Sequence, residues 1–184
     1  MEALVVIDML NDFVSGALRC ERADRIIPNI KRLIETARKH GVPVIYSNDA
    51  HLPTDFELKK WGEHAMKGTL GGEVIPELKP VKGDCVMEKR AYSGFFETGL
   101  NSLLQGLQVD TLILTGLHAN MCVRHTAADA FFRGYKIVVP NDATEAFTEK
   151  DYKEGLKYLK NVYNAEITET DKVIKNWEKQ AKKK

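Results

Sequence analysis

Short apolar runs alternate with helical patterns along almost the whole chain, and this alternation most constrains the fold. The runs are rich in β-branched residues and bounded by turn residues, which is typical of buried strands. They lie at Leu4–Asp8, Val42–Ser47, Cys85–Glu88, Thr111–Thr115, Lys136–Pro140 and, more weakly, Ala165–Thr168. Strands that alternate with helices build a mostly parallel sheet with helices on both faces, so the pattern predicts an α/β fold.

Helical patterns fill the intervals between these runs. Apolar residues recur with a helical period from Ile26 to Ala37, and the basic pair Lys39 and His40 followed by Gly41 indicates the end of that helix. Further helices are predicted at Glu97–Gln105, Met121–Gly134, Glu149–Tyr163 and Asp171–Gln180.

The segment from Asp49 to Pro80 interrupts this alternation. It is rich in Gly, Pro, Lys and Glu and shows no sustained period. Unstructured connections of that length are uncommon unless they are functional, so we expect a long functional loop or lid. The 184 residues suit one domain, and we therefore predict a single domain over 1–184 that carries this loop at about 49–80.

Charge and cysteine content restrict the kinds of partner and the cellular compartment that we expect. The chain has 27 Lys and Arg against 26 Asp and Glu, without a long run of one sign, so we expect a small-molecule partner rather than nucleic acid or a membrane. The N-terminus lacks the pattern of a secretion signal, and no apolar run approaches the roughly 20 residues of a membrane span. Cys20, Cys85 and Cys122 are too few and too far apart for a disulfide framework, so we expect a cytoplasmic protein.

Asp8, Lys89 and Cys122 each lie at or just after the end of a predicted strand. The carboxyl ends of parallel strands meet at one edge of the sheet, so these side chains should converge. Cys122 opens a predicted helix, and both a helix N-terminus and a nearby ammonium lower the pKa of a thiol, while a carboxylate can accept its proton. The pattern indicates an activated nucleophile, although each residue alone also fits an ordinary role in a turn, on the surface or in the core.

Backbone amides near Cys122 complete this prediction. The N–H of Cys122 and one from the turn Gly116–His118 could form an oxyanion hole for a carbonyl under attack.

The long loop carries a second polar group. Its carboxylates and imidazoles offer the oxygen and nitrogen ligands that Zn²⁺, Fe²⁺ or Mn²⁺ bind. The candidate ligands are Asp49, His51, Glu57 and His64. Such residues are also common on solvated loops, so spacing alone leaves both interpretations open.

Four motifs resemble the isochorismatase-like cysteine hydrolases. They are LVVIDMLNDF, the loop motifs DAH and WGEHAMKGT, EKRAYSGFFETGL, and TGLHANMCVRHTAADAFFRGY, and the resemblance runs from Leu4 to about Thr170. It implies a Rossmann-like three-layer fold with a six-stranded, mostly parallel sheet. It also implies Asp8, Lys89 and Cys122 as a catalytic triad.

The resemblance further implies a cis peptide bond before the nucleophile. This bond would join Leu117 to His118, and the amides of His118 and Cys122 would form the oxyanion hole. The family usually forms dimers or tetramers, which implies a homo-oligomer.

Within the family, the loop is similar to that of the nicotinamidases. These enzymes hold a divalent metal with an Asp-x-His pair and a later His, and some add a Glu seven residues before that His. Asp49, His51, Glu57 and His64 match this arrangement. Isochorismatases proper lack these ligands, so the resemblance implies a divalent metal, with zinc first and iron or manganese as alternatives.

The nicotinamidase resemblance also implies the substrate and its contacts. Phe13, Trp61 and Tyr92 would surround a flat ring, with core packing as the alternative for Phe13 and Trp61. The implied reaction converts nicotinamide to nicotinate and ammonia through a thioester on Cys122.

Three departures from the nicotinamidase pattern leave alternatives open. Ala50 stands where many nicotinamidases carry an aromatic residue, the ligand loop is shorter than in several of them, and His118 replaces a smaller residue near the oxyanion hole. One alternative is another hydrolase of the family that acts on a carbamoyl amide, a ureide-like compound or isochorismate. A non-catalytic metal-binding protein on the same fold is the alternative from another class, and we expect His125 to be structural.

Overall fold

A parallel β-sheet forms the centre of the computed structural model, which describes residues 1–182. Its seven strands are ordered β3-β2-β1-β4-β5-β7, with β6 beside β4. They are β1 (Glu2–Ile7), β2 (Val44–Asp49), β3 (Cys85–Lys89), β4 (Thr111–Leu117), β5 (Lys136–Pro140), β6 (Thr144–Glu145) and β7 (Glu166–Thr168). The predicted α/β fold is confirmed. Strand β6 was not predicted because two residues are too few to show a period.

Helices connect these strands. The α-helices are α1 (Asn11–Val14), α2 (Ile27–Lys39), α3 (Leu58–Trp61), α4 (Leu100–Gly106), α5 (Cys122–Phe132), α6 (Glu149–Tyr163) and α7 (Thr170–Ala181). Short 3₁₀ turns lie at Ala23–Arg25, Leu70–Gly72, Pro76–Leu78 and Asn141–Ala143. The helix predicted from Glu97 begins at Leu100 instead, because Glu97 has a left-handed backbone with φ of 53°.

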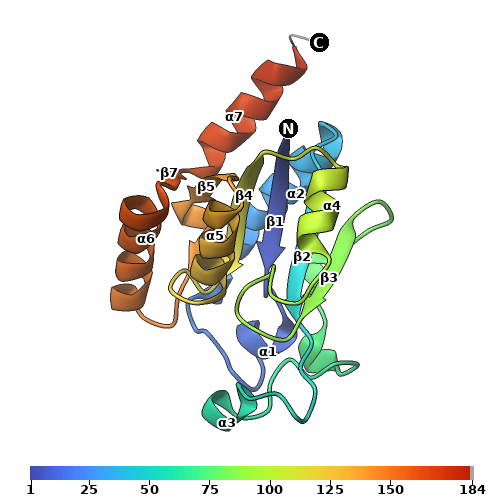
Figure 1. Ribbon diagram of the computed structural model, residues 1–184, viewed down its shortest axis with the longest axis vertical. Helices are drawn as coiled ribbons and strands as arrows, with labels where there is room; N and C mark the ends of the chain where they lie inside the picture. Colours follow the sequence, from blue (N-terminus) through green and yellow to red (C-terminus); the bar gives the residue numbers. More distant parts are fainter. Residues whose placement is uncertain (183–184) are drawn as a thin grey trace.

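The side chains of β1 alternate between two apolar cores, one on each face of the sheet. Leu4 and Val6 belong to the core that includes α2 and α7, whereas Ala3, Val5 and Ile7 belong to the core that includes α4, α5 and α6. Figure 1 shows α4 and α5 in front of the sheet and α2 behind it. The residues of β1 from Ala3 to Ile7 are completely buried, which explains why this strand reads as a continuous apolar run rather than an alternating one.

The carboxyl ends of the parallel strands meet at the edge of the sheet where α1 and α3 lie (Figure 1). The predicted loop over 49–80 covers this edge and is not structureless. The His51 N–H donates to Ala65 O at 3.0 Å, and the Lys67 N–H donates to His51 O at 2.9 Å. These bonds fold the loop back on itself, so its polar residues are held over the strand ends.

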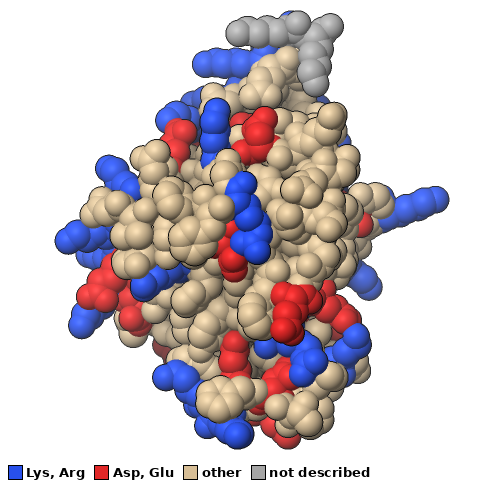
Figure 2. Space-filling model, in the orientation of Figure 1, with Lys and Arg blue, Asp and Glu red and all other residues tan. Residues whose placement is uncertain are grey.

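The surface mixes both signs of charge. Figure 2 shows Lys and Arg side chains interspersed with Asp and Glu on the face that carries α4 and α5. Over residues 1–182, no helix combines the length and apolar character needed to cross a membrane.

Candidate active site

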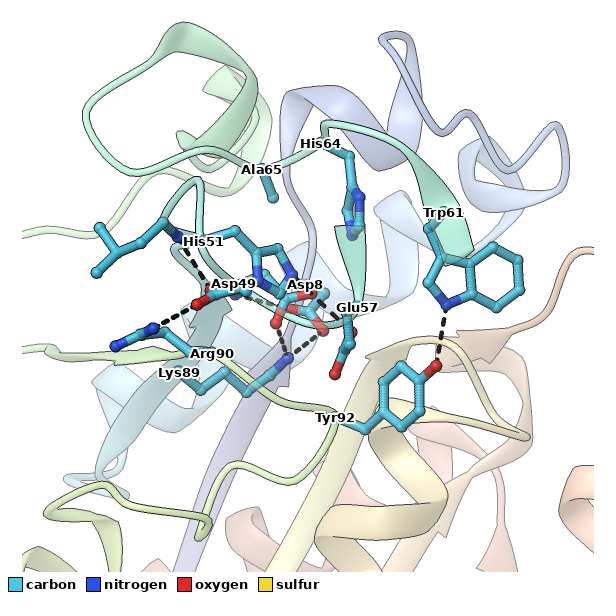
Figure 3. A network of polar contacts seen from close by, with 12 residues as sticks. Asp8, Asp49, His51, Glu57, Trp61, His64, Ala65, Lys89, Arg90 and Tyr92 are labelled. Carbon is cyan, nitrogen blue, oxygen red and sulfur yellow. Dashed lines mark hydrogen bonds and ion pairs between the residues drawn. The ribbon is translucent and has the colours of Figure 1, made fainter. Parts of the chain in front are cut away.

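Asp8 and Lys89 form a buried ion pair at the carboxyl edge of the sheet. Asp8 follows β1 with a left-handed backbone, at φ of 53°, and Lys89 ends β3. The Lys89 Nζ lies 2.8 Å from Asp8 Oδ2 and also contacts the carboxylate of Asp49. The Asp49 N–H donates to Asp8 Oδ1 at 2.8 Å. One lysine is thus shared by two carboxylates that come from neighbouring strands (Figure 3).

Cys122 joins this group from the other side, as the first residue of α5. Its Sγ and one carboxylate oxygen from each of Asp8 and Asp49 lie within 4.8 Å of one another. Cys122 is 4% exposed and Lys89 is 1% exposed. The predicted convergence of Asp8, Lys89 and Cys122 is therefore present, in a place from which bulk water is excluded.

Burial and charge set the pKa values of the two carboxyls and the ammonium. Burial and the nearby Asp49 raise the pKa of Asp8 to about 6, although Lys89 opposes this. Burial would lower the pKa of Lys89, but the charges of Asp49 and Asp8 raise it well above its ordinary value. Burial would raise the pKa of Asp49, but Lys89 and His51 lower it below its ordinary value. Lys89 is therefore charged at neutral pH, and Asp8 is largely ionised.

The structure opposes the prediction that the Cys122 thiol is acidified. Burial raises the pKa of Cys122 well above its ordinary value, Lys89 lowers it, and the charge of Asp8 raises it further. The helix N-terminus and the lysine would lower this pKa. Their effect is smaller than that of desolvation and of the neighbouring carboxylate, which both raise it. The resting pair is a thiol next to a carboxylate that can accept its proton.

The turn before Cys122 contains a cis peptide bond between Leu117 and His118, as the resemblance implied. Neighbouring amides in this turn are occupied: Ala119 N–H donates to Glu145 O at 2.8 Å, and Met121 N–H donates to His118 O at 2.9 Å. The N–H groups of His118 and Cys122 donate to no other residue within 1–182. Two unused donors beside Sγ are what an oxyanion hole requires.

Three of the four predicted metal ligands come together. One donor atom from each of Asp49, His51 and His64 lies within 4.8 Å of the other two. The His51 Nε2 lies 3.6 Å from Asp49 Oδ2, and the rings of His51 and His64 are 4.8 Å apart between centroids. The His51 Nε2 is also buried without a hydrogen-bond partner among the described residues. A carboxylate and two imidazoles, one of them with an unpartnered nitrogen, suit a divalent ion.

Glu57 lies at the rim of this group. Its Oε2 is 3.9 Å from His51 Nε2, but it is not among the three converging donors. Burial and the charge of Asp49 raise the pKa of Glu57 to about 7. Glu57 directly precedes α3 and His64 follows it, so this short helix connects two of the predicted ligands (Figure 3).

The sequence interpretation missed Asp55, which contacts the outer nitrogen of His51. The Asp55 Oδ2 lies 3.0 Å from His51 Nδ1 and is also bonded to Leu52 N–H. Its spacing of four residues after a candidate histidine ligand was the available signal, but an acid in a polar loop does not stand out.

Aromatic side chains enclose a cavity next to Cys122. The predicted Phe13, Trp61 and Tyr92 line it, together with Phe147, which was not predicted. The cavity has a volume of about 20 Å³, enough for about one water molecule. The Trp61 ring stacks against Phe147, with 6.2 Å between centroids, and Trp61 Nε1 donates to Tyr92 OH. The aromatic residues therefore leave little free space beside Cys122 in this conformation.

The two remaining histidines of interest differ in position. The His118 ring lines the cavity, stacks on Phe147 at 4.1 Å between centroids, and has an Nε2 without a hydrogen-bond partner among the described residues. Burial lowers the pKa of His118 to about 3, so the ring is neutral. His125 stacks on the ring of Tyr92 and does not line the cavity.

Comparison with known proteins identifies the family of the chain. Residues 2–172 match the isochorismatase domain family. The chain is 34% identical to the uncharacterized isochorismatase family protein YaaI of Bacillus subtilis (strain 168), over 94% of this chain and 96% of that protein. It is 35% identical to Nicotinamidase 3 of Arabidopsis thaliana, over 85% of this chain and 79% of that protein.

Solved structures show the same relationship. The N-carbamoylsarcosine amidase of Thermoplasma acidophilum is 46% identical, with a TM-score of 0.87 over 92% of this chain and 96% of that chain. The pyrazinamidase of Pyrococcus horikoshii, solved in complex with zinc, is 28% identical, with a TM-score of 0.86 over 91% of this chain and 98% of that chain. The chain belongs to the isochorismatase family.

Proposed function

We propose that the protein hydrolyses the C–N bond of a small primary amide through a thioester on Cys122. The observation that carries this proposal is the buried contact between Asp8, Lys89 and Cys122. A thiol, a carboxylate that takes its proton and an ammonium that offsets the resulting charge are the parts of an activated nucleophile. In this proposal these three residues are the catalytic residues.

The first half of the reaction forms the thioester. Asp8 takes the thiol proton as Cys122 Sγ bonds to the amide carbonyl carbon. The Lys89 ammonium stabilises the negative charge, and the N–H groups of His118 and Cys122 donate to the carbonyl oxygen. The C–N bond then breaks as Asp8 returns the proton to the nitrogen, and ammonia leaves.

The second half releases the acid. A water molecule gives a proton to Asp8 as its oxygen bonds to the thioester carbon, and the C–S bond breaks. The proton returns from Asp8 to Cys122 Sγ. One amide and one water are consumed, and one carboxylic acid and one ammonia are formed.

We propose further that Asp49, His51 and His64, with Glu57 at the rim, hold one divalent ion, with zinc as the first candidate and iron or manganese as alternatives. Support comes from the converging donors and from the zinc in the related pyrazinamidase. When bound beside the aromatic cavity, such an ion would bind a ring nitrogen of the substrate and orient the amide.

Nicotinamide is the substrate we propose first. Its ring would lie among Phe13, Trp61 and Tyr92, and its ring nitrogen would reach the metal. The similarity to Nicotinamidase 3 supports this choice. A carbamoyl amide is the second candidate, favoured by the 46% identity to the N-carbamoylsarcosine amidase.

Ammonia release from nicotinamide, benzamide and a carbamoyl amide tests the proposal. Benzamide keeps the ring and the amide but lacks the ring nitrogen, so nicotinamide should be cleaved faster by roughly two orders of magnitude or more. Turnover of the carbamoyl amide alone would overturn the nicotinamide proposal and keep the amidase proposal. If none of the three releases ammonia, the metal-binding, non-catalytic alternative is favoured.

The predicted homo-oligomer of two or four chains, and the single domain over 1–184, also remain proposals. The mass of the protein in solution tests the first, and a single cooperative unfolding transition tests the second.

A further inference from the structure

Asp55 contacts His51 on the side of the ring that faces away from the ligand group. Its Oδ2 lies 3.0 Å from His51 Nδ1, while His51 Nε2 lies 3.6 Å from Asp49 Oδ2. Asp55 is itself anchored, because Oδ2 also accepts the N–H of Leu52 at 3.0 Å. It is 7% exposed, so little water competes for these bonds.

Arg90 holds the other oxygen of this carboxylate. Its Nε donates to Asp55 Oδ1 at 2.9 Å, and its Nη2 contacts the same oxygen. These bonds hold the pKa of Asp55 well below its ordinary value, so the carboxylate acts only as an acceptor. Arg90 directly follows Lys89 at the end of β3, and its side chain is seen beside the loop in Figure 3.

The state of the His51 ring follows from these contacts. A neutral imidazole carries its proton on one nitrogen, and the acceptor at Nδ1 favours the proton there. The Nε2 lone pair then faces Asp49 and His64, and it has no other partner among the described residues. When a divalent ion binds Nε2, the proton on Nδ1 donates to Asp55, so this carboxylate holds the ring in the orientation and tautomer that binding through Nε2 requires.

His64 reaches the same state by another route. Its Nδ1 lies 2.8 Å from the backbone carbonyl of Gly62. A backbone acceptor cannot be removed by substitution, so only the His51 ring depends on replaceable side chains.

We propose that Asp55 and Arg90 are positioning residues, which fix the tautomer and orientation of His51 so that its Nε2 can bind a divalent ion. The proposal rests on the metal site of the proposed function. Arg90 lies at the strand end that carries Lys89 and holds Asp55 of the loop over 49–80. Asp55 in turn contacts His51. Carboxylate partners of histidine ligands typically change metal affinity by about 10- to 100-fold.

The test measures the affinity for Zn²⁺ alone, by competition with a chromogenic chelator. Asp55→Asn and Arg90→Gln should each weaken Zn²⁺ binding about 10- to 100-fold. Arg90→Lys keeps the charge but not the two-nitrogen contact, so it should restore only part of the affinity. Arg32→Gln is the matched control, because it removes an exposed arginine–aspartate pair, Arg32 with Asp171, outside the site. It should bind Zn²⁺ like the unmodified protein.

A second measurement separates positioning from folding. The ¹⁵N signals of the imidazoles report which ring nitrogen carries the proton, and Zn²⁺-loaded His51 should carry it on Nδ1 in the unmodified protein and on a mixture of Nδ1 and Nε2 in Asp55→Asn. Equal Zn²⁺ affinity in all variants, or an unchanged tautomer, would overturn the positioning role. If the unmodified protein itself binds no Zn²⁺, the metal part of the proposed function fails instead.

Discussion

The indole of Trp61 donates a hydrogen bond from Nε1 to the hydroxyl of Tyr92 at 2.9 Å, and both side chains line the narrow cavity beside Cys122. Trp61 belongs to α3 in the loop over 49–80, whereas Tyr92 lies after β3. A cavity of about 20 Å³ cannot accept an aromatic amide. The cavity must therefore widen before a substrate enters, and α3, which carries Trp61, buries no side chain that would resist such a movement.

Tyr92→Phe should release the Trp61 side chain from its hydrogen bond and make it more mobile. The substitution removes the hydroxyl and keeps the ring that stacks on His125, so the expected loss of stability is small, about 0.5–1.5 kcal/mol. Quenching of tryptophan fluorescence by acrylamide should increase, and the change reports Trp61 because Trp177 is 1% exposed. Unchanged quenching would mean that the bond does not restrain Trp61.

Cys122→Ala should abolish ammonia release, by on the order of 10⁴-fold or more, because no other group can form the thioester. Cys85→Ala is the control, since Cys85 lies on β3 away from the cavity and should retain activity. Both proteins should unfold at similar temperatures. Substantial turnover by Cys122→Ala would exclude the covalent mechanism.

Metal content should follow the converging ligands. Purified protein should contain about one divalent ion per chain, and His51→Ala or His64→Ala should lose it, because each removes one of the three donors. His40→Ala, at the end of α2, should keep the ion. Elemental analysis provides the measurement. Full amidase activity in metal-free protein would contradict the proposed role of the ion.

Gly155 in α6 should tolerate no side chain, because α6 packs closely on the turn that precedes Cys122. A Cβ at Gly155 would lie 2.8 Å from the carbonyl carbon and oxygen of Ala119 and 2.9 Å from Asn120 N. Gly155→Ala should therefore cost about 1–3 kcal/mol of stability and lower kcat/KM by displacing the turn.

Gly106→Ala is the matched control for this variant. Gly106 ends α4, and nothing lies within 4 Å of a Cβ placed there. The alanine should leave activity unchanged and stabilise the protein by about 0.4–1 kcal/mol. Denaturant unfolding and ammonia release measure both variants, and equal behaviour of the two would show that the turn accommodates α6.

Local patterns in the sequence were sufficient to predict the sheet and the convergence of Asp8, Lys89 and Cys122. Periodicity predicts strands and helices because each element buries one face or stripe. The parallel arrangement then brings strand ends to one edge whatever the details of packing. The resemblance of the motifs to the isochorismatase family is confirmed by the family match over residues 2–172. The catalytic roles of the three residues stay predictions.

Only the tertiary structure determined the pKa values of the site residues and their hydrogen-bond partners. The sign of the Cys122 pKa shift depends on how completely the thiol is desolvated, and no local pattern encodes that. The bonds between Arg90 and Asp55, and between Trp61 and Tyr92, join residues more than 30 positions apart along the chain. Such contacts arise when the loop folds back over the strand ends. Burial and long-range contact are properties of the packed chain, whereas strand and helix patterns are properties of short segments.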